Sequence, residues 1–269
     1  MLEKENSSKE LNENSKEDFE NAIKADIIEE KIRDQALIAK HLVKDYEIGD
    51  FIVRAVDDVS LTIYRGEFLV IKGPSGAGKT SLLNLLSGLD SPNSGIIYSF
   101  GVKISDMKAE SLTTWRLLNT GFVFQNYNLI STLTAEENVM FPMNLSGLEF
   151  KEQRKRAQRL LTDMGLGDRK EHLPFQLSAG EQQRVAIARA LANDPTIIIA
   201  DEPTANLDKK TSQFIRDLFK SLKNRVRTII VVTHDDYLIS LADKIISFDN
   251  GSIIQEEIIT EFKNLEKIS

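Results

Sequence analysis

The stretch FLVIKGPSGAGKT, residues 68–80, decides the fold, because it joins an apolar run to a glycine-rich turn and the start of a helix. Residues 68–71 have the continuous apolarity of a buried strand, and the leucines from Leu82 to Leu89 follow at helical spacing. Residues 73–80 match the pattern G-x-x-x-x-G-K-[ST] without a mismatch, in the strand-to-helix context that this pattern requires. In such a turn the backbone N–H groups and the positive end of the helix dipole converge on an anion. We therefore predict that a nucleoside triphosphate binds through Gly73, Pro74, Ser75, Gly76, Ala77, Gly78, Lys79, Thr80 and Ser81.

A second motif lies far downstream, where the apolar run 197–200 ends in two carboxylates, Asp201 and Glu202. Strand ends in an open parallel sheet face the ligand crevice. Asp201 is therefore expected to hold Mg²⁺ through water, with the Thr80 hydroxyl as a direct ligand and Lys79 on the β- and γ-phosphates. Glu202 would face an attacking water as general base if burial tunes its pKa. The competing interpretation is a strand that simply stops at a charged turn.

The remaining chain from Leu37 alternates between strand and helix patterns. Residues 37–46 and 51–64 are typical of a curled antiparallel pair, and residues 109–193 are mostly helical, with a capping-box pattern at Thr134 and Glu137. Two further apolar strands, TIIIA and TIIVV, alternate with helices, and Asn250-Gly251 predicts a hairpin turn. We predict an α/β core with a parallel sheet that a helical insertion interrupts.

Composition narrows the class of protein. Hydrophobic residues make up 41% and charged residues 28% of 269, which is typical of globular chains. No apolar stretch approaches the ~20 residues of a membrane-spanning helix, and the start of the chain lacks the apolar core of a secretory signal. The absence of cysteine excludes disulfides and thiolate metal sites, so we expect a cytosolic compartment. The net charge of -7 disfavours nucleic acid as a partner.

Much of the acidity lies in an N-terminal extension, residues 1–35, which holds eleven acidic and six basic residues. Its first half has the composition of a disordered segment. In its second half Phe19, Ile23 and Ile27 are spaced four apart, as on one face of an amphipathic helix. Two interpretations stay open: a solvated tail, or a segment that docks on a partner or on the body of the protein.

Between the two phosphate-site motifs lies LSAGEQQR, residues 177–184, which resembles the signature L-S-G-G-Q of the ATP-binding cassette (ABC) ATPases. The resemblance covers roughly residues 36–257, with the motifs in family order. It implies that Ser178 and Gly180 begin a helix that caps the γ-phosphate of an ATP held by another copy. Ala179 and Glu181 depart from the signature. Because a carboxylate cannot donate a hydrogen bond to a phosphate, we expect Glu181 to point away or to be screened.

The same resemblance assigns four more residues. Gln125 matches the glutamine that reaches Mg²⁺ and the attacking water and senses a transmembrane partner. His234 matches the switch histidine near the γ-phosphate, and Asp208 matches the aspartate that crosses the dimer interface. Tyr46 resembles the aromatic residue that stacks on adenine. The alternatives are a polar loop residue for Gln125, a structural histidine at a strand end, and a core-packing tyrosine.

The family implies a P-loop NTPase fold with a RecA-like parallel core, an antiparallel β subdomain and an inserted α-helical subdomain. We place the extension at 1–35, the ATPase domain at 36–259 with its helical subdomain at about 126–184, and a C-terminal tail at 260–269. The texts GPSGAGKTSLLNLLSGLDSPNSG and RVAIARALANDP resemble the lipoprotein-release and macrolide-export subgroup.

The resemblance implies a homodimer around two Mg-ATP (cofactors ATP and Mg²⁺) that drives a separate transmembrane permease. It implies a cytoplasmic position, peripheral on the inner face of the cell membrane, and export of a lipoprotein, peptide or drug. One alternative is an ATP-gated mechanical switch on a membrane partner, as in the related cell-division ATPase. A soluble ATPase of translation or DNA repair is another; members of that class have tandem cassettes or long coiled-coil insertions.

Overall fold

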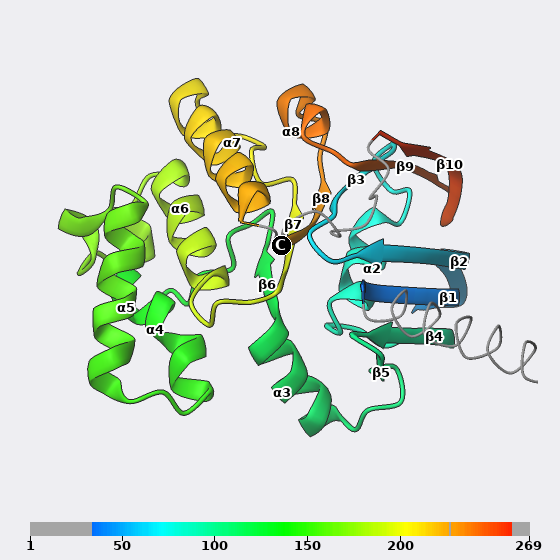
Figure 1. Cartoon of the computed structure of the whole chain (residues 1–269), viewed down its shortest axis with the longest axis horizontal. Coiled ribbons are helices and arrows are strands. Elements are labelled where there is room, and N and C mark those ends of the chain that lie inside the picture. Colours follow the sequence, from blue (N-terminus) through cyan, green and yellow to red (C-terminus); the bar gives the residue numbers. More distant parts are fainter. Residues whose placement is uncertain (1–33, 226, 260–269) are drawn as a thin grey trace, which may run out of the picture.

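The computed structural model describes residues 34–225 and 227–259, and the chain folds there around two β-sheets (Figure 1). The predicted stripe of Phe19, Ile23 and Ile27 and the predicted tail 260–269 lie outside the described residues. Across the described ranges, none of the helices combines the length and apolarity that crossing a bilayer requires.

The central sheet has six strands in the order β10-β9-β3-β8-β7-β6. Within it β6, β7, β8, β3 and β9 run parallel, and β10 pairs antiparallel with β9. This arrangement confirms the α/β class. The strands are β3 (Phe68–Lys72), β6 (Thr120–Val123), β7 (Ile197–Asp201), β8 (Thr228–Val232), β9 (Lys244–Asp249) and β10 (Ser252–Ile258).

The apolar runs of the central strands are explained by burial of both faces of the sheet. Phe68 and Val70 on β3 pack into one hydrophobic cluster with the helices that follow β6 and β7. Leu69 and Ile71, which point the other way, pack into a second cluster with the leucines of α2 (Lys79–Leu86). Side chains alternate between the faces of a strand, so a strand that is buried on both sides must be continuously apolar.

The second sheet is antiparallel, in the order β2-β1-β4-β5. Its long pair, β1 (Gln35–Ile48) and β2 (Phe51–Tyr64), confirms the predicted strand pair. The strands β4 (Ser94–Ser99) and β5 (Val102–Lys103) were not predicted from the sequence. The helix α2 packs between this sheet and the central one, with Leu82, Leu83, Leu85 and Leu86 fully buried.

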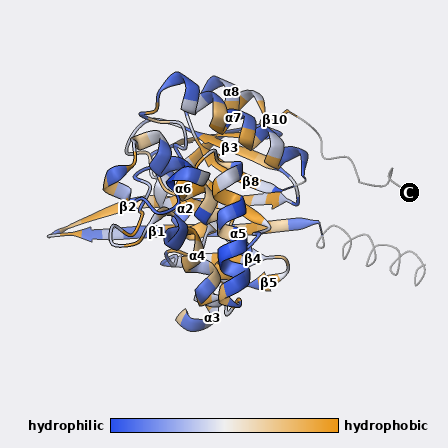
Figure 2. Ribbon diagram, turned by 90° about the vertical axis from the view of Figure 1, so that its left-hand side faces the viewer, coloured by the Kyte–Doolittle hydropathy of each residue, from blue (hydrophilic) through white to orange (hydrophobic). Residues whose placement is uncertain are grey.

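The remaining helices are α3 (Ala109–Asn119), α4 (Ala135–Leu145), α5 (Phe150–Asp163), α6 (Ala179–Ala190), α7 (Lys209–Asn224) and α8 (Asp236–Ser240), with the short 3-10 turns η1 (Gly167–Arg169) and η2 (Pro174–Gln176). Trp115 of α3 packs into the same cluster as α2, whereas most buried hydrophobic residues of α4 to α8 belong to the cluster on the other face of the sheet. In Figure 1, α4, α5 and α6 form a group at the left, beyond β6. Figure 2 shows hydrophobic residues along the central strands and hydrophilic ones on outer helices such as α5.

Three local predictions are confirmed. Thr134 caps α4, because its Oγ1 accepts from the backbone N of Glu137 at 3.2 Å and the Glu137 carboxylate accepts from the Thr134 backbone N at 2.8 Å. Asn250 and Gly251 form the β9–β10 turn with φ of 45° and 79°. The segment 109–193 is mostly helical, and it also contains the short strand β6, which pairs with β7.

Candidate active site

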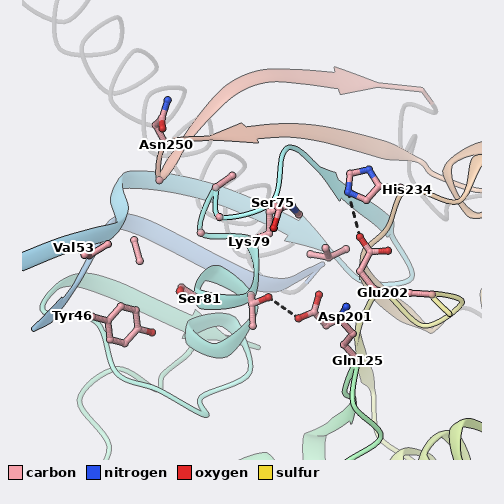
Figure 3. A pocket seen from close by; sticks show the side chains of 18 of the residues that line it. Tyr46, Val53, Ser75, Lys79, Ser81, Gln125, Asp201, Glu202, His234 and Asn250 are labelled. Atoms are coloured by element: carbon pink, nitrogen blue, oxygen red, sulfur yellow. Dashed lines mark hydrogen bonds and ion pairs between the residues drawn. The ribbon is translucent and has the colours of Figure 1, made fainter. Parts of the chain in front are cut away.

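A cavity of about 1000 Å³ opens at the carboxyl ends of the parallel strands. The loop after β3, the end of β7 and the segment after β8 meet there, as Figure 3 shows. It brings together most of the residues predicted from the sequence: Tyr46, Ser75, Gly76, Ala77, Gly78, Lys79, Thr80, Ser81, Gln125, Asp201, Glu202 and His234. Gly73 and Pro74 lie directly behind the lining, at the start of the loop.

The glycine-rich loop is a tight turn whose conformation only certain residues allow. Gly78 has φ of 97°, and a Cβ there would lie 2.0 Å from the carbonyl oxygen of Ala55 on β2. The Lys79 ammonium donates to the carbonyl oxygens of Gly73 and Pro74 at 2.7 Å each. The lysine therefore bridges the loop on which it stands, and its positive charge sits at the start of α2, where the helix dipole also favours an anion.

Thr80 and Asp201 meet across the floor of the cavity. The Thr80 hydroxyl donates to Oδ2 of Asp201 at 2.7 Å, and Gln125 lies beside this pair (Figure 3). Burial raises the pKa of Asp201, while the Thr80 hydrogen bond and the Lys79 charge oppose that shift. A hydroxyl, a carboxylate and an amide oxygen are hard ligands, so these three residues fit a Mg²⁺ ion that also binds phosphates.

Glu202 follows Asp201 in a left-handed backbone conformation, with φ of 46°. Its backbone N–H donates to the carbonyl oxygen of Val232 on β8 at 2.8 Å, which holds the residue at the cavity wall. Burial raises the pKa of Glu202, and His234 opposes the shift. Nε2 of His234 lies 3.4 Å from Oε1 of Glu202. A half-buried carboxylate of raised pKa beside an imidazole is equipped to accept a proton from water.

Tyr46 lines the far side of the same cavity and is half-buried, so it is not a core residue. Its hydroxyl donates to Oδ2 of Asp90 at 2.9 Å. Lys44 Nζ donates to Oδ1 of Asp90 at 2.7 Å and lies 5.1 Å from the centre of the Tyr46 ring. Asp90 and Lys44 therefore hold the ring from its edge and from one face. Burial raises the pKa of Tyr46.

The structure does not bring Ser178, Gly180 and Asp208 to this cavity. Ser178 and Asp208 line a different one, of about 390 Å³, at the starts of α6 and α7. Asp208 caps α7: its carboxylate accepts from the backbone N–H groups of Lys210 and Thr211 and from the Thr211 hydroxyl at 2.7 Å. The Thr211 hydrogen bonds hold the pKa of Asp208 below its usual value.

Glu181 is folded back onto Ser178, which agrees with the expectation that its carboxylate is screened. Oε2 of Glu181 accepts from the Ser178 backbone N at 2.8 Å and from the Ser178 hydroxyl at 2.9 Å. The Glu181 backbone N in turn donates to Ser178 Oγ at 3.3 Å. Arg169 lies 3.7 Å from its other oxygen. The hydrogen bonds from Ser178 lower the pKa of Glu181.

Ala179 and Gly180 stand at the two glycine positions of the family signature, and they differ in whether a larger side chain fits. Gly180 is buried, and a Cβ there would lie 2.7 Å from Oγ1 and 2.9 Å from Cγ2 of Thr211. Ala179 is exposed, so its methyl group meets no such obstacle. The departure at Ala179 is therefore compatible with the fold.

Several lining residues were missed by the sequence analysis. Val53 and Arg54 come from β2, and Asn250 and Gly251 come from the β9–β10 turn. The turn itself was predicted, but nothing local shows that it reaches the phosphate loop. Lys44 does not line the cavity but supports Tyr46, and for it a signal existed: it lies two residues before Tyr46, so both side chains share one face of the strand.

The comparisons with known proteins agree with this geometry. The ABC transporter family pattern matches residues 56–205. An uncharacterized ABC transporter ATP-binding protein of Methanocaldococcus jannaschii is 48% identical over 217 residues, which span 81% of this chain and 97% of the relative. The macrolide export ATP-binding/permease protein MacB of Bartonella quintana is 42% identical over 87% of this chain, which covers 36% of that longer protein.

Among solved structures, a dimeric ATP-binding cassette in a post-hydrolysis state bound to ADP and Pi superposes with a TM-score of 0.80. It is 42% identical, and the match covers 84% of this chain and all of the other. The family pattern spans more than half of this chain, and the archaeal relative matches nearly end to end. The chain therefore belongs to the ABC transporter family and is an ATP-binding cassette ATPase.

Proposed function

We propose that two copies of this chain close around two Mg-ATP, hydrolyse them, and drive a separate membrane permease. One observation carries the proposal. The loop, the Mg²⁺ ligands and the base share one cavity, whereas Ser178 and Asp208 line another on the same chain. An isologous pair would let each copy offer its Ser178 surface to the ATP of the other. The related cassette bound to ADP and Pi is dimeric.

Within one copy, different residues contact the base, the phosphates and the metal ion of the nucleotide. Tyr46 would stack on the base, the loop N–H groups and Lys79 would bind the phosphates, and Thr80, Asp201 and Gln125 would hold the metal. Bound Mg²⁺ would neutralise charge that develops on the transferred phosphoryl group. Lys79 must exchange its two carbonyl partners, Gly73 and Pro74, for phosphate oxygens when ATP enters.

Glu202 acts as the general base toward the attacking water. Its raised pKa makes it a better proton acceptor than an ordinary carboxylate. His234, 3.4 Å away, orients the carboxylate and contacts the γ-phosphate. The positive φ of Glu202 turns its side chain toward the phosphates instead of along β7.

The transport direction and partner class rest on relatives. The MacB protein of Bartonella quintana is named as an ATP-binding/permease protein for macrolide export. From this similarity we infer that this chain works at the inner face of the cell membrane, together with a permease that exports a lipoprotein, peptide or drug. The permease selects the transported molecule.

Glu202→Gln tests whether two copies of the chain close around ATP. The change keeps the shape of the side chain but removes the base, so hydrolysis should fall by roughly 10²–10⁴ while ATP still binds. The variant should then accumulate as an ATP-dependent dimer in analytical ultracentrifugation. Adding Ser178→Arg is the matched control, because its bulk should block the dimer and spare ATP binding to the loop. A monomer at saturating ATP in the Glu202→Gln variant would contradict the proposal.

Co-purification from membranes tests whether the chain binds a membrane permease. The Glu202→Gln protein, trapped with ATP, should co-purify from detergent-solubilised membranes with a polytopic protein. ATP turnover that a candidate substrate stimulates in the reconstituted complex would support transport. A complex whose turnover no solute alters would instead support the mechanical switch.

A further inference from the structure

The β1–β2 hairpin has an apolar face that begins at the nucleotide cavity and continues beyond it. Tyr46 pairs with Val53 across the two strands, and both line the cavity (Figure 3). The next pair on the same side of the hairpin is Ile48 with Phe51, because residues two apart in a strand point the same way. This outer pair lies about 7 Å further along the strands. Ile48 is 62% exposed and Phe51 is 76% exposed.

The opposite face of the hairpin is mostly polar. It carries Asp45, Glu47 and Arg54, and Arg54 Nε donates to Oδ1 of Asp45 at 2.9 Å. Ile52 is the one apolar side chain on that face between residues 45 and 54. The described part of the chain leaves the apolar face uncovered at its outer pair. The apolar surface therefore lies on the side of the hairpin that adjoins the nucleotide cavity.

A second exposed aromatic residue, Phe175, lies three positions before the signature serine Ser178 and is 77% exposed. The turn η2 that carries it is closed by hydrogen bonds. The backbone N of Gln176 donates to the carbonyl oxygen of Leu173 at 2.9 Å, and the side-chain oxygen of Gln176 accepts from the Leu173 backbone N at 2.8 Å. Because the turn is already ordered, little backbone entropy is lost when Phe175 enters an interface.

We propose that, in the ATP-bound dimer, the partner's Phe175 packs against Ile48 and Phe51, so that the second copy closes the base end of each nucleotide cavity. The inference rests on the proposed function, in which Ser178 of one copy contacts the ATP of the other. Three residues span at most about 10 Å, so Phe175 remains beside the nucleotide that Ser178 contacts.

A second copy fits this face better than another protein does. The hairpin face adjoins the base end of the cavity through Tyr46 and Val53, and Phe175 adjoins the signature serine. The same closure that brings Ser178 to an ATP therefore brings the two apolar surfaces toward each other. Aromatic side chains are frequent anchors of interfaces, and two-fold symmetry would form the contact twice in each dimer.

ATP-dependent dimerisation of the Glu202→Gln protein, measured by analytical ultracentrifugation, tests the contact. Phe51→Ser and Phe175→Ser should each weaken the dimer at least about tenfold, as expected for an aromatic anchor. The variant with both changes should be about as weak as either single one, because each change removes the same contact. Two matched controls should leave the dimer unchanged: Ile52→Ser on the other face of the hairpin, and Phe150→Ser, which is 65% exposed at the start of α5.

A disulfide gives a direct test, since the chain has no cysteine. The Glu202→Gln chain with Phe51→Cys and Phe175→Cys, under a mild oxidant, should form a covalent dimer at least tenfold faster with ATP than without it. The control combines Phe51→Cys with Phe150→Cys and should not respond to ATP. The melting temperature without ATP should be the same for all variants, because substitutions of exposed side chains alter stability little.

The outcomes separate this inference from the proposed function. If the Glu202→Gln protein dimerises with ATP but Phe51→Ser and Phe175→Ser leave the dimer unchanged, the inference is wrong and the proposed dimer is not. Additive effects of the two changes, or a disulfide that forms equally without ATP, would also overturn the inference. A Glu202→Gln protein that stays monomeric at saturating ATP would overturn both.

Discussion

Glu181→Gln tests whether the hydrogen bond between Ser178 and Glu181 limits the binding of Ser178 to the ATP of another copy. In the structure the Ser178 hydroxyl donates to the Glu181 carboxylate at 2.9 Å. A hydroxyl has one proton, so this hydrogen bond must be given up before Ser178 can donate to a γ-phosphate. The side-chain oxygen of a glutamine can accept the same two hydrogen bonds, but because it is uncharged it holds the Ser178 proton less strongly. The proton is then released to the phosphate at a lower cost.

The size of the effect follows from the two kinds of hydrogen bond. A bond to a charged group contributes about 1.5–3 kcal/mol and a neutral one about 0.5–1.5 kcal/mol, so releasing the hydroxyl costs about 1 kcal/mol more with glutamate. A symmetric dimer has two such sites, which makes about 2 kcal/mol, or roughly thirtyfold in the dimerisation constant. The Glu181 side chain is 23% exposed, and solvent screening lowers this upper value.

The assay is ATP-dependent dimerisation in the Glu202→Gln background, followed by sedimentation over a range of protein concentrations. Adding Glu181→Gln should tighten the dimer severalfold, up to that limit, and leave turnover of the otherwise wild-type enzyme within about a few-fold. Arg169→Gln is the control, since it removes the ion pair at 3.7 Å and a contact with His172 but leaves both hydrogen bonds from Ser178 to Glu181 in place. A dimer that is weaker with Glu181→Gln would refute the reasoning, because the carboxylate would then make a productive contact across the interface.

Three further predictions concern other parts of the site. Lys79→Ala removes the cation from the phosphate loop and should weaken Mg-ATP binding at least tenfold in calorimetry; wild-type affinity would place the phosphates elsewhere. Tyr46→Phe removes the 2.9 Å hydrogen bond from the Tyr46 hydroxyl to Asp90, which holds the ring in place, and should raise the KM for ATP a few-fold; an unchanged KM would contradict the role of Tyr46 at the base. Because hydrogen bonds hold the pKa of Glu181 below its ordinary 4.5, its ionised form stabilises the fold at neutral pH. That contribution is lost as pH falls through the lowered pKa, so the stability difference from Glu181→Gln in urea unfolding should shrink between about pH 5 and pH 3.

The parts of the fold that local pattern determines could be predicted from the sequence. The junction at residues 68–80 carries strand, turn and helix signals in one stretch, and β3 and α2 lie where they indicate. The capping residues Thr134 and Ser178 were recognisable from spacing or family resemblance, because a capping box needs only residues three apart. Asp201 and Glu202 were recognisable because a buried strand ends there.

Features that depend on partners distant in the chain could not be predicted. The strand β4 pairs with β1 through Ala39 and Ile97, and β5 is two residues long, so neither has a local pattern. The contact between Tyr46 and Asp90 joins residues 44 positions apart. The same holds for the cavity lined by Arg65, Arg225 and Arg227, because these residues come from the β2–β3 turn and from the segment between α7 and β8.

The β9–β10 turn has a consequence for engineering this chain. Surface turns usually tolerate added residues, and the β4–β5 turn fits that rule, since a Cβ at Gly101 would meet nothing within 4 Å. Gly251 is different: its N–H donates to the Ala77 carbonyl at 2.9 Å, and its carbonyl accepts from Asp57 at 2.8 Å. A tag or sensor domain inserted at this turn would displace the loop that cradles phosphate, whereas one inserted at Gly101 in the β4–β5 turn would leave the nucleotide cavity untouched, because that turn does not line it.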